Sequence, residues 1–362
     1  MASGNLAHTP WWAWAWPALA GLVLIIYYAF HPGRPFAALE ALVLVATVFA
    51  AVYHAEVVAH SVGEPFGTLV LALAVTIIEV ALIVSVMITG GPENAVLARD
   101  TVFAAVMIVC NGIVGLCLLA GGMRHGEQGF QLQGANAALS VLIVLTTLTL
   151  VFPNVTVSTF GPTFSPPQLI FAAVVSLVLY CAFLFVQTVR HRDYFLPPGG
   201  GSDETHAPPP PQKVALRSAG LLLVSLVCVV LIAKTLTPVL ERGIDRVGAP
   251  KTVVGTIIAA LVLLPEGLAT FRAARANRLQ TSMNLALGSA LASIGLTIPS
   301  VAAVSLLLHK PLTLGLSSKE EVLLAVTLVV SILTLGTGRT TVLQGVVHLM
   351  LFAVFLFLAF VP

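Results

Sequence analysis

Long apolar runs fill most of this chain and decide what it can fold into. A helix needs about 20 largely apolar residues to cross the hydrocarbon core of a bilayer. Alternating apolar and polar residues, which a membrane β-barrel requires, do not occur in these runs. We therefore predict an all-α polytopic membrane protein with about eleven transmembrane helices, at residues 11–30, 36–54, 66–90, 101–122, 134–153, 167–189, 214–240, 251–271, 282–308, 320–336 and 340–361.

The composition excludes the main soluble classes of protein. Apolar residues make up 58% of the chain and charged residues only 9%, against about 25% charged residues in an ordinary soluble domain. The 17 basic and 15 acidic residues nearly cancel, so no strong field attracts a nucleic acid. The four cysteines lie in apolar runs without a metal-binding spacing and are expected to pack as small core residues. The lipid bilayer is the expected partner, and the oligomeric state stays open.

A single polar segment, residues 190–213, interrupts the apolar pattern. Its prolines, glycines and charges cannot build a core, so we predict a linker. If the N-terminus is cytoplasmic, nine Lys and Arg residues fall in cytoplasmic loops and seven in external loops. The cluster of Arg272, Arg275 and Arg278 points the same way. We expect the N-terminus and the linker of this multi-pass protein to be cytoplasmic.

The two halves on either side of the linker share a spaced pattern. In each half a Glu is followed seven residues later by a Gly, then by a Gly-Thr pair and an apolar run that ends in a second Glu. The matching residues are Glu56, Gly63, Gly67, Thr68 and Glu79 in the first half, and Glu241, Gly248, Gly255, Thr256 and Glu266 in the second. The second glutamates lie five spans apart, and an odd offset inverts the direction of equivalent helices. Inverted repeats are typical of transporters. We predict an extra helix in 1–35 and two inverted five-helix repeats in 36–189 and 214–362.

Glu79 and Glu266 are acidic residues inside predicted spans. An ionised carboxylate at the bilayer centre costs on the order of 3 kcal/mol, so it must hold a proton or meet a cation. Two carboxylates in one dry site cannot both ionise without a cation between them. Ca²⁺ prefers hard oxygen ligands, and its binding would expel protons. The pair is therefore predicted to bind either a cation or protons, whereas Glu40 is expected to hydrogen-bond a neighbouring helix.

Neutral oxygen atoms lie close to these glutamates in the predicted spans. Thr76 precedes Glu79 by one turn, Asn111 lies in the fourth span, and Ser289 and Ser293 lie in the ninth. Plain helix packing is the alternative explanation for the serines. Weaker candidates are His54, Glu56 and His60, which could relay protons near neutral pH or simply line a solvated helix end, and His348, which is expected to be a packed polar residue.

The stretches HAEVVAHSVGEPFGTLVLALAVTIIEVALIVSVM, GTIIAALVLLPEGL and NLALGSALASIGLTIPS closely resemble the ChaA-type bacterial antiporters, members of the calcium/proton exchanger group within the calcium:cation antiporter superfamily. The resemblance covers roughly residues 40–360. It implies eleven helices, an extra first helix and two inverted repeats with one essential Glu each, Glu79 and Glu266. It also implies polar ligands at Asn111 and at Ser289 and Ser293. Members of the group exchange Ca²⁺, Na⁺ or K⁺ for protons.

The leading hypothesis is therefore a secondary transporter that exchanges Ca²⁺, or Na⁺ or K⁺, for protons by alternating access without a cofactor. Two other classes remain as alternatives. A membrane-embedded enzyme is disfavoured because its usual motifs, such as HExxH or an aspartate-rich diphosphate site, are missing from the spans. A cation channel is disfavoured because the spans offer a local polar cluster rather than a continuous polar path.

Overall fold

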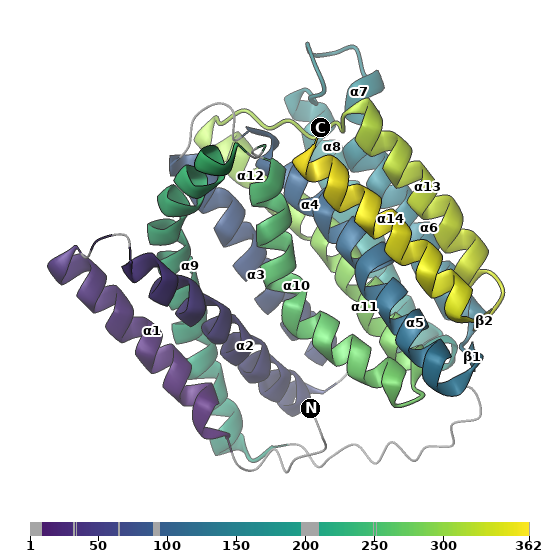
Figure 1. Cartoon of the computed structure of the whole chain (residues 1–362), viewed down its shortest axis with the longest axis horizontal. Helices are drawn as coiled ribbons and strands as arrows, with labels where there is room; N and C mark the ends of the chain where they lie inside the picture. The colour runs from purple at the N-terminus through teal and green to yellow at the C-terminus, as the bar shows by residue number, and fades with distance from the viewer. Residues whose placement is uncertain are drawn as a thin grey trace. The chain divides into compact units, whose positions relative to one another are not determined.

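The computed structural model describes residues 9–31, 33, 35–63, 66–89, 95–196, 210–248, 250 and 252–361. Over these residues the protein is almost entirely helical, which confirms the predicted all-α membrane fold (Figure 1). Ten helices in the described part of the chain are long and apolar enough to cross a membrane. The predicted span at 320–336 forms a further helix, α13 (Ser318–Leu335), whose first turn carries Lys319, Glu320 and Glu321.

The helices form two compact units, each assembled from separate stretches of the chain. The first comprises residues Met1–Thr89 and Ser202–Gly248. Its helices are α1 (Trp11–Phe30), α2 (Phe36–Val62), α3 (Phe66–Thr89) and α9 (Gln212–Val247). Helix α2 packs against the other three. It is longer than the predicted span 36–54, and beyond that span its buried Val57 packs in a cluster with Ala13 of α1 and Tyr53. The Tyr53 ring contacts Trp12 edge-to-face.

The second unit comprises Gly90–Gly201 and Ala249–Pro362. Its long helices are α4 (Leu97–Met107), α5 (Val114–His125), α6 (Leu132–Thr146), α8 (Pro166–Phe185), α10 (Thr252–Arg275), α11 (Leu279–Gly295), α12 (Thr297–Leu308), α13 and α14 (Val342–Phe360). A short helix, α7, spans Phe152–Val155, and the strands β1 (Gln128–Gly129) and β2 (Arg339–Thr340) pair antiparallel. Helix α10 packs lengthwise on α4 and α5, and α14 packs on α5.

Several predicted spans are interrupted in their middle. A π-helical turn at Ile108–Ile113 joins α4 to α5, and Leu296 separates α11 from α12. Further π-helical turns follow α6 at Thr147–Val151 and α8 at Val186–Arg190. Such turns often lie at functional sites because they leave backbone groups outside the regular ladder. The interruptions were not predicted, because one extra residue in a helical turn leaves the apolar pattern of the sequence unchanged.

Two glycines of the repeated sequence pattern allow helices to approach closely. In the first unit, a Cβ on Gly67 would meet the Ala59 carbonyl of α2 at 2.5 Å. In the second unit, a Cβ on Gly255 would meet the Asp100 Cβ and the Thr101 nitrogen at 2.9 Å. Both contacts lie below the distances that real Cβ atoms adopt, so a larger residue would push the helices apart. Most of the predicted linker 190–213, Pro65, and the side chains of Thr68 and Glu241 lie outside the described residues.

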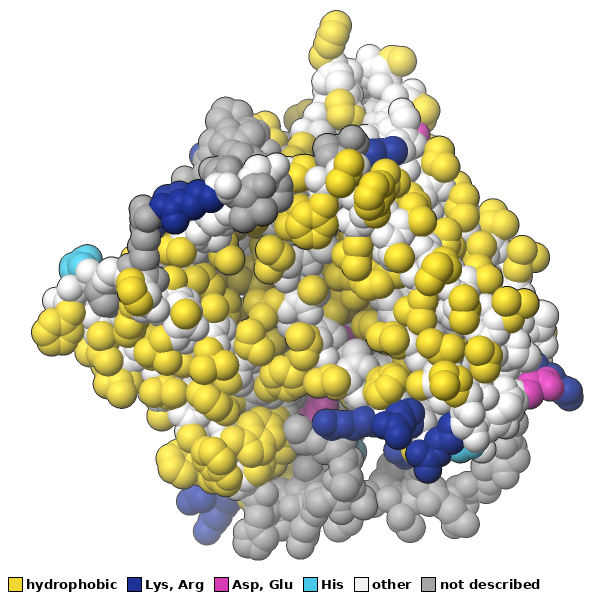
Figure 2. All heavy atoms as spheres, in the orientation of Figure 1, with side chains coloured by type: hydrophobic (Ala, Val, Ile, Leu, Met, Phe, Trp, Pro, Cys, Tyr) yellow, Lys and Arg dark blue, Asp and Glu magenta, His cyan; other side chains and the backbone are white. Residues whose placement is uncertain are grey.

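Apolar side chains cover the sides of the helices, as a lipid-facing surface requires. Figure 2 shows hydrophobic side chains over the helix sides, and Lys and Arg side chains near helix ends. In the second unit the exposed apolar residues of α14 include Leu343, Met350, Val354 and Phe357. Exposed large apolar residues are costly in water and favourable in lipid, which agrees with the predicted membrane location.

Candidate functional site

Glu266 lies in the third turn from the end of α10, and its surroundings are polar despite the apolar sequence around it. The Ser289 hydroxyl on α11 donates a hydrogen bond to its carboxylate oxygen Oε2. Pro265 directly precedes it and lacks the backbone N–H that the helix would otherwise use. The Thr270 hydroxyl donates to the Glu266 carbonyl at 2.7 Å. The structure thus brings two predicted site residues, Glu266 and Ser289, into direct contact.

Ser293 lies one turn after Ser289 on α11 and is buried, with 3% of its surface exposed. Residues four apart on a helix share a face, so the two serines form one polar strip. Glu79 and Thr76 lie in the first unit, on α3, with 2% and 5% exposure. They are three residues apart and also share a helix face. The predicted ligands thus belong to two sets, one in each unit.

Asn111 is fully buried in the π-helical turn between α4 and α5. Its side-chain nitrogen donates to the Thr327 hydroxyl of α13 at 2.9 Å. Its carbonyl oxygen Oδ1 lies 3.1 Å from Nδ1 of His348 on α14. Because an amide oxygen only accepts, Nδ1 carries the hydrogen. His348 Nε2 in turn lies 3.1 Å from the Thr334 hydroxyl, so it accepts in the neutral tautomer.

This network confirms that His348 is a packed polar residue and adds two partners that the sequence did not single out, Thr327 and Thr334. All four side chains are at most 3% exposed. Fully satisfied buried networks hold their members in fixed orientations. The Asn111 oxygen has a second lone pair, so it can accept another contact while His348 holds the amide in place.

The possible proton relay lies on α2 in the first unit. His54 is fully buried, and its Nε2 lies 2.9 Å from the Ala13 carbonyl of α1, whereas His60 is exposed and Glu56 half-buried. A helix turns by about 100° per residue, so His54 and Glu56 point to opposite sides of α2. The relay therefore stays a prediction. The expectation for Glu40 is confirmed, because the Thr235 hydroxyl of α9 donates to its carboxylate at 2.8 Å.

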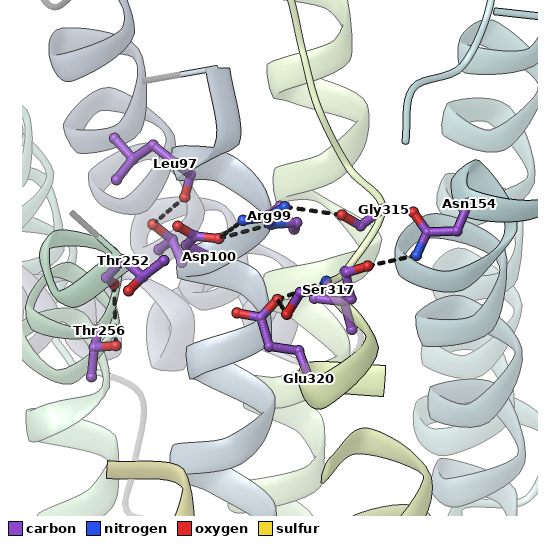
Figure 3. Close-up of polar contacts among 11 residues, drawn as sticks. Leu97, Arg99, Asp100, Asn154, Thr252, Thr256, Gly315, Ser317 and Glu320 are labelled. Carbon is purple, nitrogen blue, oxygen red and sulfur yellow. Dashed lines mark hydrogen bonds and ion pairs between the residues drawn. The ribbon is translucent and has the colours of Figure 1, made fainter. Parts of the chain in front are cut away.

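A second acidic cluster, missed by the sequence reasoning, lies where α4, α10 and α13 begin (Figure 3). Asp100 is 4% exposed and forms an ion pair with Arg99 at 2.7 Å. Arg99 also donates to the Gly315 carbonyl at 3.0 Å. Glu320, at 9% exposure, accepts hydrogen bonds from the backbone and hydroxyl of Ser317. Acidic residues in the first turn of a helix are the signal that could have found this cluster.

Comparison with known proteins places the chain in a family. The family model described as sodium/calcium exchanger protein matches residues 36–189 and 217–361. The chain belongs to this exchanger family. It is 35% identical over 350 residues to the sodium-potassium/proton antiporter ChaA of Escherichia coli strain K12, covering 95% of this chain and 94% of that protein. It is 50% identical over 360 residues to y4hA of Sinorhizobium fredii, covering 98% of both.

Solved structures agree on the fold of this exchanger. Native YfkE superposes with a TM-score of 0.73 at 18% identity, covering 97% of this chain and all of that one. The H⁺/Ca²⁺ exchanger CAX superposes with a TM-score of 0.69 at 17% identity, covering 96% of this chain and 88% of that one. The protein is thus a membrane transporter of inorganic cations, and not an enzyme.

Proposed function

We propose that this exchanger trades Ca²⁺, or Na⁺ or K⁺, for protons by alternating access, with Glu79 and Glu266 each binding either a cation or a proton. The observation that carries the proposal is the Glu266 carboxylate, which accepts the Ser289 hydroxyl from a neighbouring helix within a membrane span. A hydroxyl donor can hold the carboxylate in position without neutralising its charge, which a cation or a proton can do.

Competition at these carboxylates would couple the two fluxes. A bare carboxylate in the membrane interior is costly, so each glutamate is occupied by a proton or by a cation. A cation that binds an ionised carboxylate takes the place of the proton on that group. Because each ligand must leave before the other binds, net transport of one requires countertransport of the other.

Neutral oxygens would complete the coordination. Thr76 joins Glu79 on α3, Ser289 and Ser293 lie on α11, and Asn111 contributes its carbonyl oxygen from the π-helical turn. Carboxylate, amide and hydroxyl oxygens are the ligands that Ca²⁺ and the alkali cations prefer. We assign these four residues to cation binding, and His348 to holding the Asn111 amide.

The orientation and the repeats belong to the same proposal. The N-terminus and the linker 190–213 are cytoplasmic, in a bacterial inner membrane, with one extra helix in 1–35 and inverted repeats in 36–189 and 214–362. The arginine cluster at the end of α10 supports this orientation. The spaced pattern shared by the two halves supports the repeat, because Glu79 and Glu266 end equivalent apolar runs.

The test is a proton-flux assay in everted membrane vesicles. A pH gradient is formed first, and CaCl₂, NaCl or KCl is then added at equal ionic strength. The transported cation should dissipate the gradient, and the other cations should not. Vesicles without the protein set the baseline. A gradient unaffected by all three cations, in vesicles shown to contain the folded protein, would contradict proton-coupled exchange.

The orientation is tested by labelling. Ser202→Cys, in a background with the exposed Cys181 replaced by Ser, places a reactive thiol in the linker. In intact cells it should react only with a membrane-permeant reagent. Labelling from outside by an impermeant reagent would reverse the orientation while leaving the exchange activity untouched.

A further inference from the structure

A cavity lies between the first turns of α4, α10 and α13 and the end of α14, within the second unit. It encloses about 380 Å³, part of it open to solvent, and its walls include Asp100, Thr252, Thr256, Glu320 and the rim residue Lys319. Figure 3 shows that these acids and hydroxyls come from three different helices. None of the residues proposed above for exchange lines this cavity.

Only one of the two oxygens of the Asp100 carboxylate has a partner among the described residues. Its oxygen Oδ1 takes both contacts with Arg99, at 2.7 and 2.8 Å. Its other oxygen, Oδ2, is buried and has no hydrogen-bond partner among the described residues. The side chain as a whole is 3% exposed. Leaving a buried carboxylate oxygen without a partner costs roughly 1–3 kcal/mol or more, which favours a ligand beside it.

The charges around the cavity indicate what that occupant is. Asp100 and Glu320 are both buried, and Arg99, with 12% of its side chain exposed, is the one base among the described residues at that depth near the cavity. One negative charge is therefore left over inside. Lys319 is exposed at the rim, and its ammonium group lies 3.4 Å from the Leu358 carbonyl at the end of α14. Solvent weakens its effect, and it acts on Asp100 less than Arg99 does.

The N-terminal ends of three helices favour a metal ion over a proton as the ligand of these carboxylates. Helices α4, α10 and α13 all begin at the cavity, and the positive ends of their dipoles favour ionised carboxylates over neutral ones. Ionised Asp100 and Glu320 with two threonine hydroxyls form a set of hard oxygen donors. The same dipole ends weaken cation binding, so the affinity is low. A divalent ion would leave a net positive charge in the cavity, because only one negative charge there is uncompensated.

We propose that this cavity is a low-affinity loading site for a monovalent metal cation, Na⁺ or K⁺, held by Asp100 Oδ2 with the Thr252 and Thr256 hydroxyls. Thr256 lies ten residues before Glu266 on α10, about 15 Å along the helix axis. With the orientation proposed above, the cavity opens to the outside. This site rests on the proposed function, because it adds a binding site on the path of the cation to Glu266. Its test measures occupancy of the cavity and does not require exchange.

The test reads occupancy of the cavity directly. Ala359→Cys places a reporter thiol in the cavity wall, in a background with Cys181 replaced by Ser. In the reconstituted full-length protein, its modification by a small thiol reagent is timed in Na⁺, K⁺, Ca²⁺ or N-methylglucamine at equal ionic strength. At a concentration near twice the dissociation constant, Na⁺ or K⁺ should slow the reaction about threefold relative to N-methylglucamine.

Matched variants separate the possible causes of such protection. Asp100→Asn should abolish it, and Thr252→Val should reduce it, which serves if Asp100→Asn fails to fold. Glu321→Gln removes a neighbouring acid that bonds Asn154 instead of the cavity, and protection should persist. Glu266→Gln should also keep protection while losing exchange, so failure of this site and failure of the proposed function are distinguishable.

Three results would overturn the loading site. The first is equal modification rates in Na⁺, K⁺ and N-methylglucamine. The second is protection by acid pH alone, which would assign the cavity to a proton. The third is protection by Ca²⁺ that matches or exceeds that by Na⁺ and K⁺, which would contradict the charge balance.

Discussion

Glu266 and Asp100 are two acids on neighbouring helices of one unit with different partners. The Glu266 carboxylate accepts the neutral hydroxyl of Ser289 in the middle part of α10. The Asp100 carboxylate lies in the first turn of α4 and forms an ion pair with Arg99. A neighbouring cation favours the ionised form of an acid, whereas a neutral hydroxyl donor adds no charge to the site. The two acids therefore differ in their partners and not only in their burial.

The largest expected effect is on the exchange rate, and it distinguishes Glu266 from Asp100. Glu266→Gln removes the exchangeable charge, because Gln resembles the protonated acid and cannot neutralise a cation, and Glu79→Gln should do the same. Each should lose exchange by more than about 100-fold, as expected for a group essential to the step. Asp100→Asn should keep the maximal rate and raise the apparent cation Km. Initial rates of proton flux in proteoliposomes measure both.

Glu127→Gln is the matched control for these variants. Glu127 is an exposed acid of the same unit, 3.5 Å from Arg339, and an exposed pair contributes little to stability. Its rates should equal those of the unmodified protein. Retention of more than half the transport by folded Glu266→Gln would remove the distinction between the two acids.

A second prediction concerns the contact that holds α10 against α4. In Gly255→Ala the new methyl group would lie 2.9 Å from Asp100 Cβ and the Thr101 nitrogen. Overpacking of this kind costs about 1–3 kcal/mol. The melting temperature of the solubilised protein should fall. Gly220→Ala on α9 is the control, because a Cβ there meets nothing within 4 Å; an equal loss in both variants would contradict the close approach.

The smallest expected effect sharpens the account of Glu266. Ser289→Ala removes the hydroxyl donor but leaves the carboxylate, so exchange should persist with an altered cation Km. A buried hydrogen bond to a charged group contributes about 1.5–3 kcal/mol. Because Ser289 and Glu266 are half-buried, we expect a smaller contribution and a few-fold change in the cation Km. Ser300→Ala, whose hydroxyl bonds only its own helix backbone in the described contacts, should leave Km unchanged. A shift of equal size in both variants would contradict a specific role for Ser289.

Much of this molecule could be predicted from sequence, for identifiable reasons. The apolar runs define the helices because lipid admits few other structures, and the isolated charges of Glu79, Glu266 and Glu40 stand out against them. The contact between Glu266 and Ser289 follows from polar residues on consecutive spans. Asn111 is a polar residue inside an apolar span, and the resemblance to the exchangers supports its role as a ligand.

Other features depend on contacts that sequence patterns do not record. Arg99 reaches the Gly315 carbonyl, and Asn111 reaches Thr327, each across 216 residues. In the sequence, Asp100 and Glu320 resemble ordinary residues at span ends. The close packing at Gly255 brings Asp100 next to the first turn of α10. The π-helical turn at Asn111 changes one hydrogen-bond step without changing the apolar pattern.

The competition between protons and cations tests the central claim most directly. If both ligands use the Glu79 and Glu266 carboxylates, lowering the pH fills these groups with protons, and the cation must then displace them. The apparent cation Km should rise as pH falls, by up to about tenfold per pH unit for each proton displaced. Two carboxylates contribute to the curve, so it need not resolve into one step per residue.

The measurement is the cation Km from about pH 9 down to about pH 6.5 in proteoliposomes, a range that spans the physiological values, with proton flux recorded in parallel. The account predicts a Km that rises on acidification and protons that move opposite to the cation at every pH. A Km independent of pH, together with cation flux that builds no opposing proton gradient, would contradict exchange at these carboxylates.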